Sequence, residues 1–201
     1  MKWYTGVGSR ETPVEMQEFI KALAAKLAGM EFTLRSGGAK GADQAFELGW
    51  LDWYVNQSPW PSGENVRAEI YTPWDGYEGH DRDGLFGATK SPKDVHFKVW
   101  EQAEQIAAKI HPAWDTKRED GTPVLSQGAK TLHTRNVFQV LGPHLNEPST
   151  MLICWAKRTR NGTIKGGTAT AWKLAQEYGV PCFNLDDPEH FARIQKFMEG
   201  R

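Results

Sequence analysis

The sequence contains little cysteine: among 201 residues only Cys154 and Cys182 carry a thiol. Both stand in apolar stretches that are typical of buried strands, and two thiols are too few for a disulfide framework or a cysteine-rich zinc site. The six histidines do not repeat at the spacing of a helical metal site. These shortages predict two reduced, buried thiols and no bound metal.

Long apolar runs are missing as well, and the net charge is small. No stretch reaches the roughly 18 apolar residues of a membrane-spanning helix, and the N-terminus has no basic leader before an apolar core. We therefore expect a cytoplasmic protein without a membrane partner. The 24 lysines and arginines balance 25 aspartates and glutamates to a formal net charge of −1, which argues against a broadly basic surface that coats nucleic acid.

Strand-like and helix-like segments alternate along the chain. This alternation, with several strands apolar on both faces, predicts an α/β fold: a Rossmann-like three-layer sandwich with a mostly parallel sheet of about five strands. One domain is expected over 1–201, with a long loop at about 72–90 and a connecting loop at about 111–126. The expected strands are 3–7, 31–35, 66–71, 151–155 and 180–185.

Helix starts and stops carry their own signals. Thr12, Pro13 and Glu15 form an expected N-cap, first-turn proline and capping box for a helix that Gly29 ends. Asp187 is the expected cap of a C-terminal helix. Further helices are expected from Ala39 to Trp53, from Ser91-Pro92 to about Ile110, from Lys130 to Leu145 and from Thr168 to Tyr178.

Three glycine-bearing segments each follow a predicted strand and precede a helix: 6–10, 36–43 and 162–168. Glycine lets backbone N–H groups approach an anion, and the first turn of a helix adds unpaired donors and a partial positive charge. Right-handed crossovers bring such loops to the carboxyl edge of a parallel sheet. The leading interpretation is therefore a nucleotide held by its phosphate.

Several side chains in these segments have two interpretations. Arg10, beside Ser9, either binds a phosphate or pairs on the surface with Glu11 or Glu15. Asp43 either accepts a hydrogen bond from a ribose hydroxyl or complements the dipole of its helix. Lys165, with the upstream cations Lys157, Arg158 and Arg160, suits a polyphosphate, and the alternative is a solvated basic loop.

Packing alone does not explain three glycines at positions 37, 38 and 41, because alanine would serve a packed loop at lower entropic cost. Replacing Gly37 or Gly167 by valine is therefore expected to abolish binding and to leave the helix content largely intact. Trp74, in the long loop, either stacks on a base at the rim of the site or anchors the loop to the body.

Taken together, the ordered segments resemble the SLOG superfamily, a Rossmann-like group that includes the DNA-processing protein A family, cytokinin-activating phosphoribohydrolases and YspA-like proteins. Segments 6–10 and 36–43 resemble its first two loops, and 162–170 resembles its late Gly-Gly-Thr phosphate loop. Arg135-Asn136 is similar to the Arg-Asn pair that YspA-like members carry in the helix before the late strand. The resemblance implies a ligand made of phosphate, ribose and base.

Three functions follow from the motifs and the resemblance. The first is a nucleotide-binding sensor, carrier or sequestering protein that needs no cofactor. The second is an N-glycosidic hydrolase of a nucleoside phosphate, although alanine stands where those relatives place a glutamate after Gly167-Thr168. The catalytic residue is then unknown, with Asp43, Asp75, Glu78, Asp81 and Asp83 as candidate carboxylates.

The third function is single-stranded DNA binding, which the net charge disfavours and the cations between Lys157 and Lys165 keep open. Assembly of like chains through exposed helices also stays open. The expected ligand-binding residues are Gly8, Ser9, Arg10, Ser36, Gly37, Gly38, Lys40, Gly41, Asp43, Trp74, Arg135, Asn136, Thr163, Lys165, Gly166, Gly167 and Thr168.

Overall fold

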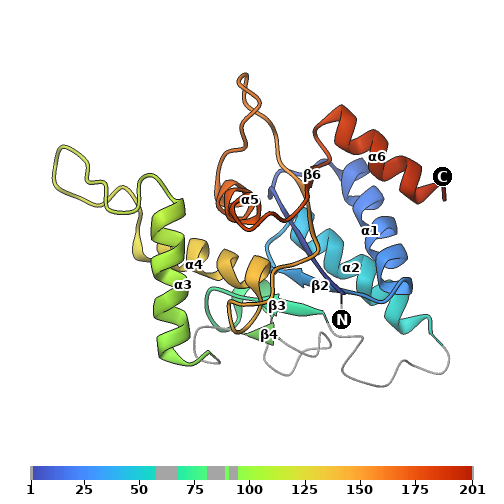
Figure 1. Cartoon of the computed structure of the whole chain (residues 1–201), viewed down its shortest axis with the longest axis horizontal. Helices are drawn as coiled ribbons and strands as arrows, with labels where there is room; N and C mark the ends of the chain where they lie inside the picture. Colours follow the sequence, from blue (N-terminus) through green and yellow to red (C-terminus); the bar gives the residue numbers. More distant parts are fainter. Residues whose placement is uncertain (1, 58–67, 81–88, 91–94, 201) are drawn as a thin grey trace.

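In the computed structural model six strands form one sheet in the order β4-β3-β2-β1-β5-β6, and every neighbouring pair is parallel (Figure 1). The structure describes residues 2–57, 68–80, 89–90 and 95–200. The parallel α/β architecture predicted from the sequence is confirmed. The strands are β1 (Lys2–Gly8), β2 (Phe32–Ser36), β3 (Glu69–Tyr71), β4 (Thr89–Lys90), β5 (Met151–Trp155) and β6 (Cys182–Asn184).

Helices cover both faces of this sheet and complete the three layers. One apolar cluster packs α1, α2 and α6 against one face, and a second packs α3, α4 and α5 against the other. Within the described residues no helix has the length and apolar character needed to cross a membrane. The helices are α1 (Val14–Gly29), α2 (Ala42–Val55), α3 (Phe97–Ile110), α4 (Gln127–Leu141), α5 (Gly167–Glu177), α6 (Pro188–Met198) and the short 3-10 helix η2 (Tyr77–Gly79).

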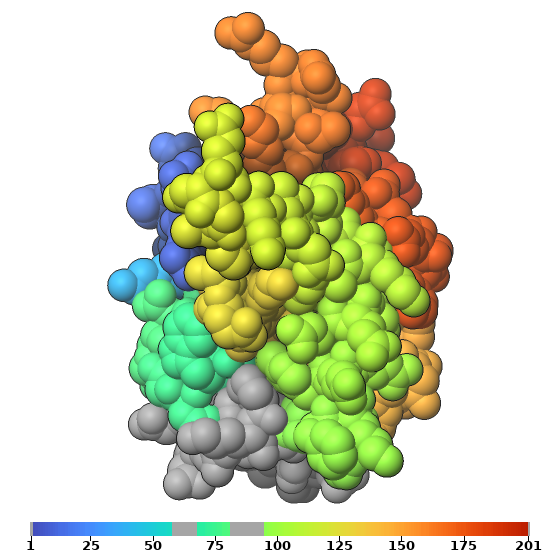
Figure 2. Space-filling view, turned by 90° about the vertical axis from the view of Figure 1, so that its left-hand side faces the viewer, coloured from blue at the N-terminus to red at the C-terminus, as the bar shows by residue number. Residues whose placement is uncertain are grey.

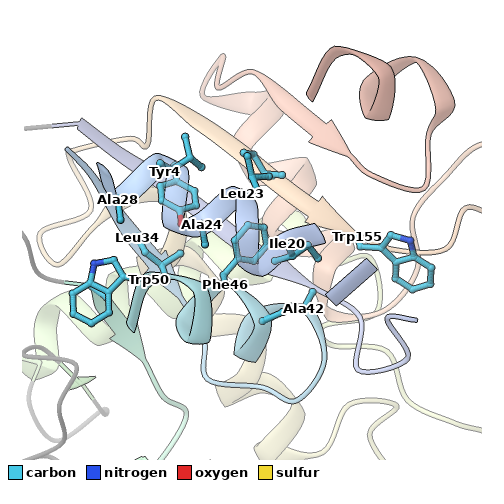
Figure 3. Packing of buried hydrophobic residues seen from close by; sticks show 14 of the residues in the cluster. Tyr4, Ile20, Leu23, Ala24, Ala28, Leu34, Ala42, Phe46, Trp50 and Trp155 are labelled. Atoms are coloured by element: carbon cyan, nitrogen blue, oxygen red, sulfur yellow. The ribbon is translucent and has the colours of Figure 1, made fainter. Parts of the chain in front are cut away.

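The first core lies between β1, β2 and the helices α1 and α2 (Figure 3). Tyr4 on β1 meets Phe46 on α2 edge to face, with ring centroids 6.0 Å apart. A Cβ at Gly6 would lie 2.7 Å from the Phe46 ring, so glycine admits that ring against the strand. Burial of aromatic and branched side chains here holds α2 close to the sheet.

The second core lies under α4. Tyr71, Phe138 and Trp100 form a continuous stack with centroid separations of 5.7 and 5.6 Å. Cys154 is buried beside them and Cys182 is half-buried, and both are free thiols. The stack ties α3 and α4 to the sheet and fixes the position of α4 over its carboxyl edge.

Several predicted boundaries are wrong, each for a local reason. Thr12 donates its hydroxyl to the Ser9 carbonyl at 2.6 Å, so it ties down the turn after β1, and α1 begins without a side-chain cap. The α4 helix begins three residues before Lys130, because Ser126 caps it by accepting from the Ala129 amide, and it ends at Leu141 before Gly142. The predicted Asp187 cap of α6 is confirmed.

The two predicted loops also differ in part from the structure. The stretch 72–90 contains η2 and the two-residue strand β4, which extends the sheet from five strands to six. The predicted α3 cap at Ser91-Pro92 lies outside the described residues, and α3 begins at Phe97 after His96. The loop 111–126 has no helix, and an antiparallel bridge joins Lys117 to Pro123 within it.

Candidate ligand-binding cleft

A cleft of about 1070 Å³ opens where β1 and β5 end, at the carboxyl edge of the sheet. Its walls come from the loop after β1, the start of α2, α4, the segment 156–166 and the first turn of α5. Open parallel sheets bind ligands at this edge. The predicted site residues that line it are Gly8, Ser9, Arg10, Asp43, Arg135, Asn136, Thr163, Lys165, Gly166, Gly167 and Thr168.

Two backbone amides where β1 ends donate to groups within the protein. The Ser9 amide donates to the Trp155 carbonyl at 2.9 Å, and the Gly8 amide donates to Asp43 Oδ1 at 2.9 Å. A Cβ at Gly8 would lie 2.5 Å from the Trp155 oxygen, so this glycine permits close contact between β1 and β5. The amides of Gly8 and Ser9 therefore hold the edge of the sheet together and are not available to a ligand.

Arg10 is the exposed cation of this loop. Its Nη2 donates to the Tyr77 hydroxyl at 2.9 Å, and the described residues show no ion pair between it and Glu11 or Glu15. The surface-pairing interpretation of Arg10 is therefore wrong. A guanidinium has five N–H donors, so the bond to Tyr77 orients Arg10 and leaves donors for an anion in the cleft.

The second glycine segment, 36–41, lies mostly beneath the surface. The Gly37 carbonyl accepts from Arg135 Nη1, and a Cβ at Gly37 would overlap that guanidinium and the Gln139 amide. Gly38 lies against the His80 ring, where a Cβ would come within 2.8 Å. The expectation that these glycines give no packing benefit is wrong, because even alanine would collide here.

The remaining predicted residues of this region also lie outside the cleft lining. Ser36 is fully buried, and Gly41, at φ +84°, has no room for a Cβ beside the Ser9 carbonyl. Lys40 is exposed, with its amine 3.5 Å from the Glu78 carboxylate. Trp74 is 46% exposed and meets Tyr77 edge to face at 5.3 Å.

Asp43 and Arg135 form a buried pair between the two loops. Arg135 Nη1 lies 3.7 Å from Asp43 Oδ2, and the two residues are 7% and 3% exposed. Burial raises the pKa of Asp43 to about 6, and the Arg135 charge opposes this rise. The interpretation of Arg135 and Asn136 as an exposed helix face is excluded, since both are buried.

A second polar pair, which the sequence analysis missed, supports this arrangement. His80 Nε2 donates to Glu47 Oε2 on α2 at 2.7 Å, and this hydrogen bond raises the pKa of His80. The Arg135 guanidinium lies 5.7 Å from the Tyr77 ring centre. The sequence contains one signal for this pair, which is Glu47 itself: a carboxylate stands among the apolar residues Ala45, Phe46, Gly49 and Trp50 of α2.

The segment 156–166 forms a projecting hairpin (Figures 1 and 2). An antiparallel bridge joins Arg158 to Ile164, the Thr159 amide donates to the Thr163 carbonyl at 2.8 Å, and the hydroxyls of these threonines lie 2.7 Å apart. This hydrogen bonding gives the basic loop a fixed shape. The basic loop is therefore an ordered hairpin, and most of its residues are exposed to solvent.

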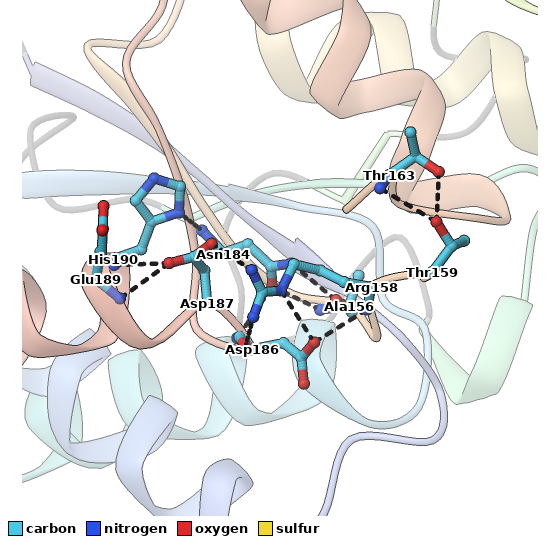
Figure 4. A network of polar contacts seen from close by, with 9 residues as sticks. All are labelled: Ala156, Arg158, Thr159, Thr163, Asn184, Asp186, Asp187, Glu189 and His190. Atoms are coloured by element: carbon cyan, nitrogen blue, oxygen red, sulfur yellow. Dashed lines mark hydrogen bonds and ion pairs between the residues drawn. The ribbon is translucent and has the colours of Figure 1, made fainter. Parts of the chain in front are cut away.

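The base of the hairpin is anchored to the start of α6 (Figure 4). Arg158 donates to Asp187 Oδ2 at 2.6 Å, and its amide donates to Asp186 Oδ2 at 3.0 Å. The side-chain amide of Asn184 accepts from the Ala156 N–H at 3.0 Å and donates to the Ala156 carbonyl at 2.8 Å. Arg158 therefore holds the hairpin in place and differs from the other cations of the cleft lining in being ion-paired.

The other cations of the hairpin form no ion pair within the described part of the chain. Lys157, Arg160 and Lys165 are exposed and line the cleft, and the carboxylates of the described residues form no ion pair with them. They stand beside the first turn of α5, which begins after Gly166 without a side-chain cap. A Cβ at Gly167 would approach only Asn136 Nδ2, at 4.0 Å, so space for a ligand remains here.

The candidate carboxylates for hydrolysis are dispersed. Asp43 lines the cleft, whereas Asp75 and Glu78 do not. Asp81 and Asp83 lie outside the described residues.

Comparisons with known proteins agree with the fold. No protein-family model and no curated protein matches the sequence. A solved structure of DNA processing protein A from Helicobacter pylori, studied for its single-stranded DNA binding mode, superposes with a TM-score of 0.51 at 16% identity. The match covers 99% of this chain and 79% of that chain. This chain therefore has a fold like that of DNA processing protein A.

Proposed function

We propose that the cleft binds a nucleotide through its phosphate, and that the chain is a nucleotide-binding protein of the SLOG type. The observation that carries this proposal is the uncapped start of α5 beside the unpaired cations Lys157, Arg160 and Lys165. The first N–H groups of a helix have no partner within the helix and carry partial positive charge. An anion supplies the missing acceptor.

The charge balance of the cleft supports the same ligand class. Arg135 compensates Asp43, and Glu11 is the remaining acidic side chain in the lining. Arg10 and the three hairpin cations then give an excess of positive charge, although the whole chain carries −1. Local positive charge in a concave site concentrates anionic ligands. A phosphate-bearing ligand fits this better than a neutral one.

A second candidate is that the bound nucleotide belongs to single-stranded DNA. The solved neighbour with this fold binds single-stranded DNA. The hairpin projects from the body of the molecule (Figure 2) and adds cations to the lining of the cleft, so a second phosphate of a strand could pass beside them. This candidate requires affinity that falls steeply with salt, because each neutralised phosphate releases counterions.

Titration calorimetry on the full chain tests both candidates. AMP, ADP, ATP and decathymidylate are titrated at about 50 mM and about 200 mM salt. Saturable binding of a mononucleotide supports the free-nucleotide function. Binding of decathymidylate alone, with a steep loss at the higher salt, supports the second candidate. No binding of any of these ligands overturns the proposal.

A matched pair of lysines locates the binding. Lys165→Ala removes an unpaired cation of the cleft and is expected to weaken binding about tenfold, since a charge-assisted contact contributes about 1.5 kcal/mol. Lys40→Ala removes an exposed cation that lies outside the cleft and close to Glu78, so affinity should not change. Equal effects of the two substitutions would place the ligand elsewhere.

A further inference from the structure

The wall that α4 contributes to the cleft differs in character from the hairpin. Ala129, Leu132, His133 and Asn136 line the cleft at helical positions i, i+3, i+4 and i+7, so they share one face of α4. Burial lowers the pKa of His133 to about 4, which leaves the ring neutral at pH 7. This stripe therefore carries no charge, whereas the hairpin wall is cationic.

The cleft has room for a ligand with more than a phosphate. Its volume of about 1070 Å³ is at the upper end of the range for small-molecule sites, about 300–1000 Å³. The unpaired hairpin cations line only the part beside the start of α5, and the proposed phosphate would take up only that part. The uncharged stripe then lines the remaining space, and a flat, neutral group with hydrogen-bonding edges suits it.

His133 is held in one orientation on this stripe. Its Nδ1 lies 2.9 Å from the Thr170 hydroxyl on α5, and its ring centre lies 4.3 Å from that of His111. With Nδ1 engaged, Nε2 is the remaining polar atom of the ring, and the part of the chain that the structure describes gives it no hydrogen-bond partner. A fixed ring nitrogen of this kind can distinguish donors from acceptors on a ligand.

We propose that His133 determines specificity by hydrogen bonding to the edge of the nucleobase, while Leu132 contacts the base. This inference rests on the proposed function, because it takes the phosphate to lie at the start of α5. The two walls then bind the two ends of one nucleotide. Bases that present the wrong group to His133 bind more weakly, since a buried polar atom left unpaired is costly.

Calorimetry with base-bearing and base-free ligands tests the assignment. AMP, GMP, CMP and UMP are compared with ribose 5-phosphate, and decathymidylate with an abasic decamer. The wild-type chain should bind its preferred nucleotide at least about tenfold more tightly than the base-free ligand. His133→Ala should reduce this ratio to below about threefold, with ribose 5-phosphate bound as before.

Two further variants separate specificity from folding. His111→Ala removes the neighbouring ring, which does not line the cleft, and should keep the base preference. Thr170→Val removes the tether at Nδ1, keeps the His133 ring, and should lower the preference even if His133→Ala does not fold. Circular dichroism confirms that each variant is folded.

The outcomes are distinct. An unchanged ratio in His133→Ala, or equal weakening of ribose 5-phosphate and nucleotide, overturns the assignment of His133 and leaves the phosphate site standing. An unchanged ratio in Thr170→Val overturns it as well if His133→Ala is unfolded. A wild-type chain that binds none of the seven compounds overturns the proposed function and this inference together.

Discussion

Two glycine-rich loops of similar composition have opposite environments in this molecule. In the early loop, 36–41, a Cβ at Gly37 would overlap Arg135 and one at Gly38 would press on His80. In the late loop a Cβ at Gly166 meets nothing within 4 Å, and one at Gly167 meets a single atom at 4.0 Å. Glycine makes room for protein side chains in the first loop and leaves open space beside the proposed phosphate site in the second.

The polar groups around the loops differ in the same way. The cations near the early loop are engaged: Arg135 with Asp43, and Lys40 with Glu78. Those on the late hairpin, apart from Arg158, form no ion pair with the described carboxylates. Unpaired charge together with open backbone indicates a binding surface, whereas paired and buried charge indicates a structural one.

The largest effect we expect comes from the same substitution in each loop. Gly37→Val inserts a branched side chain where Arg135 and Gln139 already stand, and should cost at least about 3 kcal/mol of unfolding free energy. Gly167→Val should leave stability within about 0.5 kcal/mol and weaken nucleotide binding at least about tenfold, by blocking the approach to α5. Urea denaturation and calorimetry measure both quantities.

The sequence alone predicts that both valine variants keep their helix content. The structure predicts instead that only Gly167→Val keeps its stability. If Gly167→Val lost as much stability as Gly37→Val, the late loop would also be a packing element, and the contrast between the loops would fail. If Gly37→Val folded normally and lost only binding, the early loop would belong to the binding site.

The contrast between the two loops also shows which features of the fold and the site could be predicted from the sequence. Strand and helix periodicity predicted the parallel sheet, and β5 matches its predicted bounds, because an apolar run flanked by polar residues has few alternatives. The convergence of Gly8, Asp43 and Gly167 on one cleft follows from parallel topology. The roles of Gly37 and Arg158 could not be predicted, since their partners Arg135 and Asp187 are distant in sequence.

A second prediction concerns the buried pair beneath the early loop. The pKa of Asp43 is about 6 in the folded chain and 3.8 ordinarily, so the folded state holds a proton between these values that the unfolded state has released. This linkage stabilises the fold fully below pH 3.8 and the contribution is lost as pH rises through about 6. The difference corresponds to about 3 kcal/mol at most.

Asp43→Asn should therefore remove this part of the pH dependence. Urea denaturation from about pH 4 to about pH 7 measures it as the difference between wild type and variant. Asp115→Asn, at a carboxylate whose side chain is 89% exposed, is the control and should keep the wild-type profile. A wild-type profile in Asp43→Asn would show that Asp43 does not titrate in this range.

The smallest effect distinguishes two arginines of the hairpin. Arg158 is bonded to Asp187 at the start of α6, whereas Arg160 is exposed and forms no ion pair with the described carboxylates. Arg158→Gln should lower thermal stability because it loosens the base of the hairpin. The loss should be smaller than the loss expected for Gly37→Val. Arg160→Gln should leave the melting temperature unchanged and weaken nucleotide binding by about threefold to tenfold.

These two substitutions remove the same charge at positions two residues apart, so net charge and long-range electrostatics change equally in both variants. A difference between them then reports the local environment of each arginine. Scanning calorimetry gives the stability and titration calorimetry gives the affinity. If Arg160→Gln destabilised the chain and Arg158→Gln did not, the hairpin would be held by its tip, and the anchoring contact to Asp187 would carry no weight in solution.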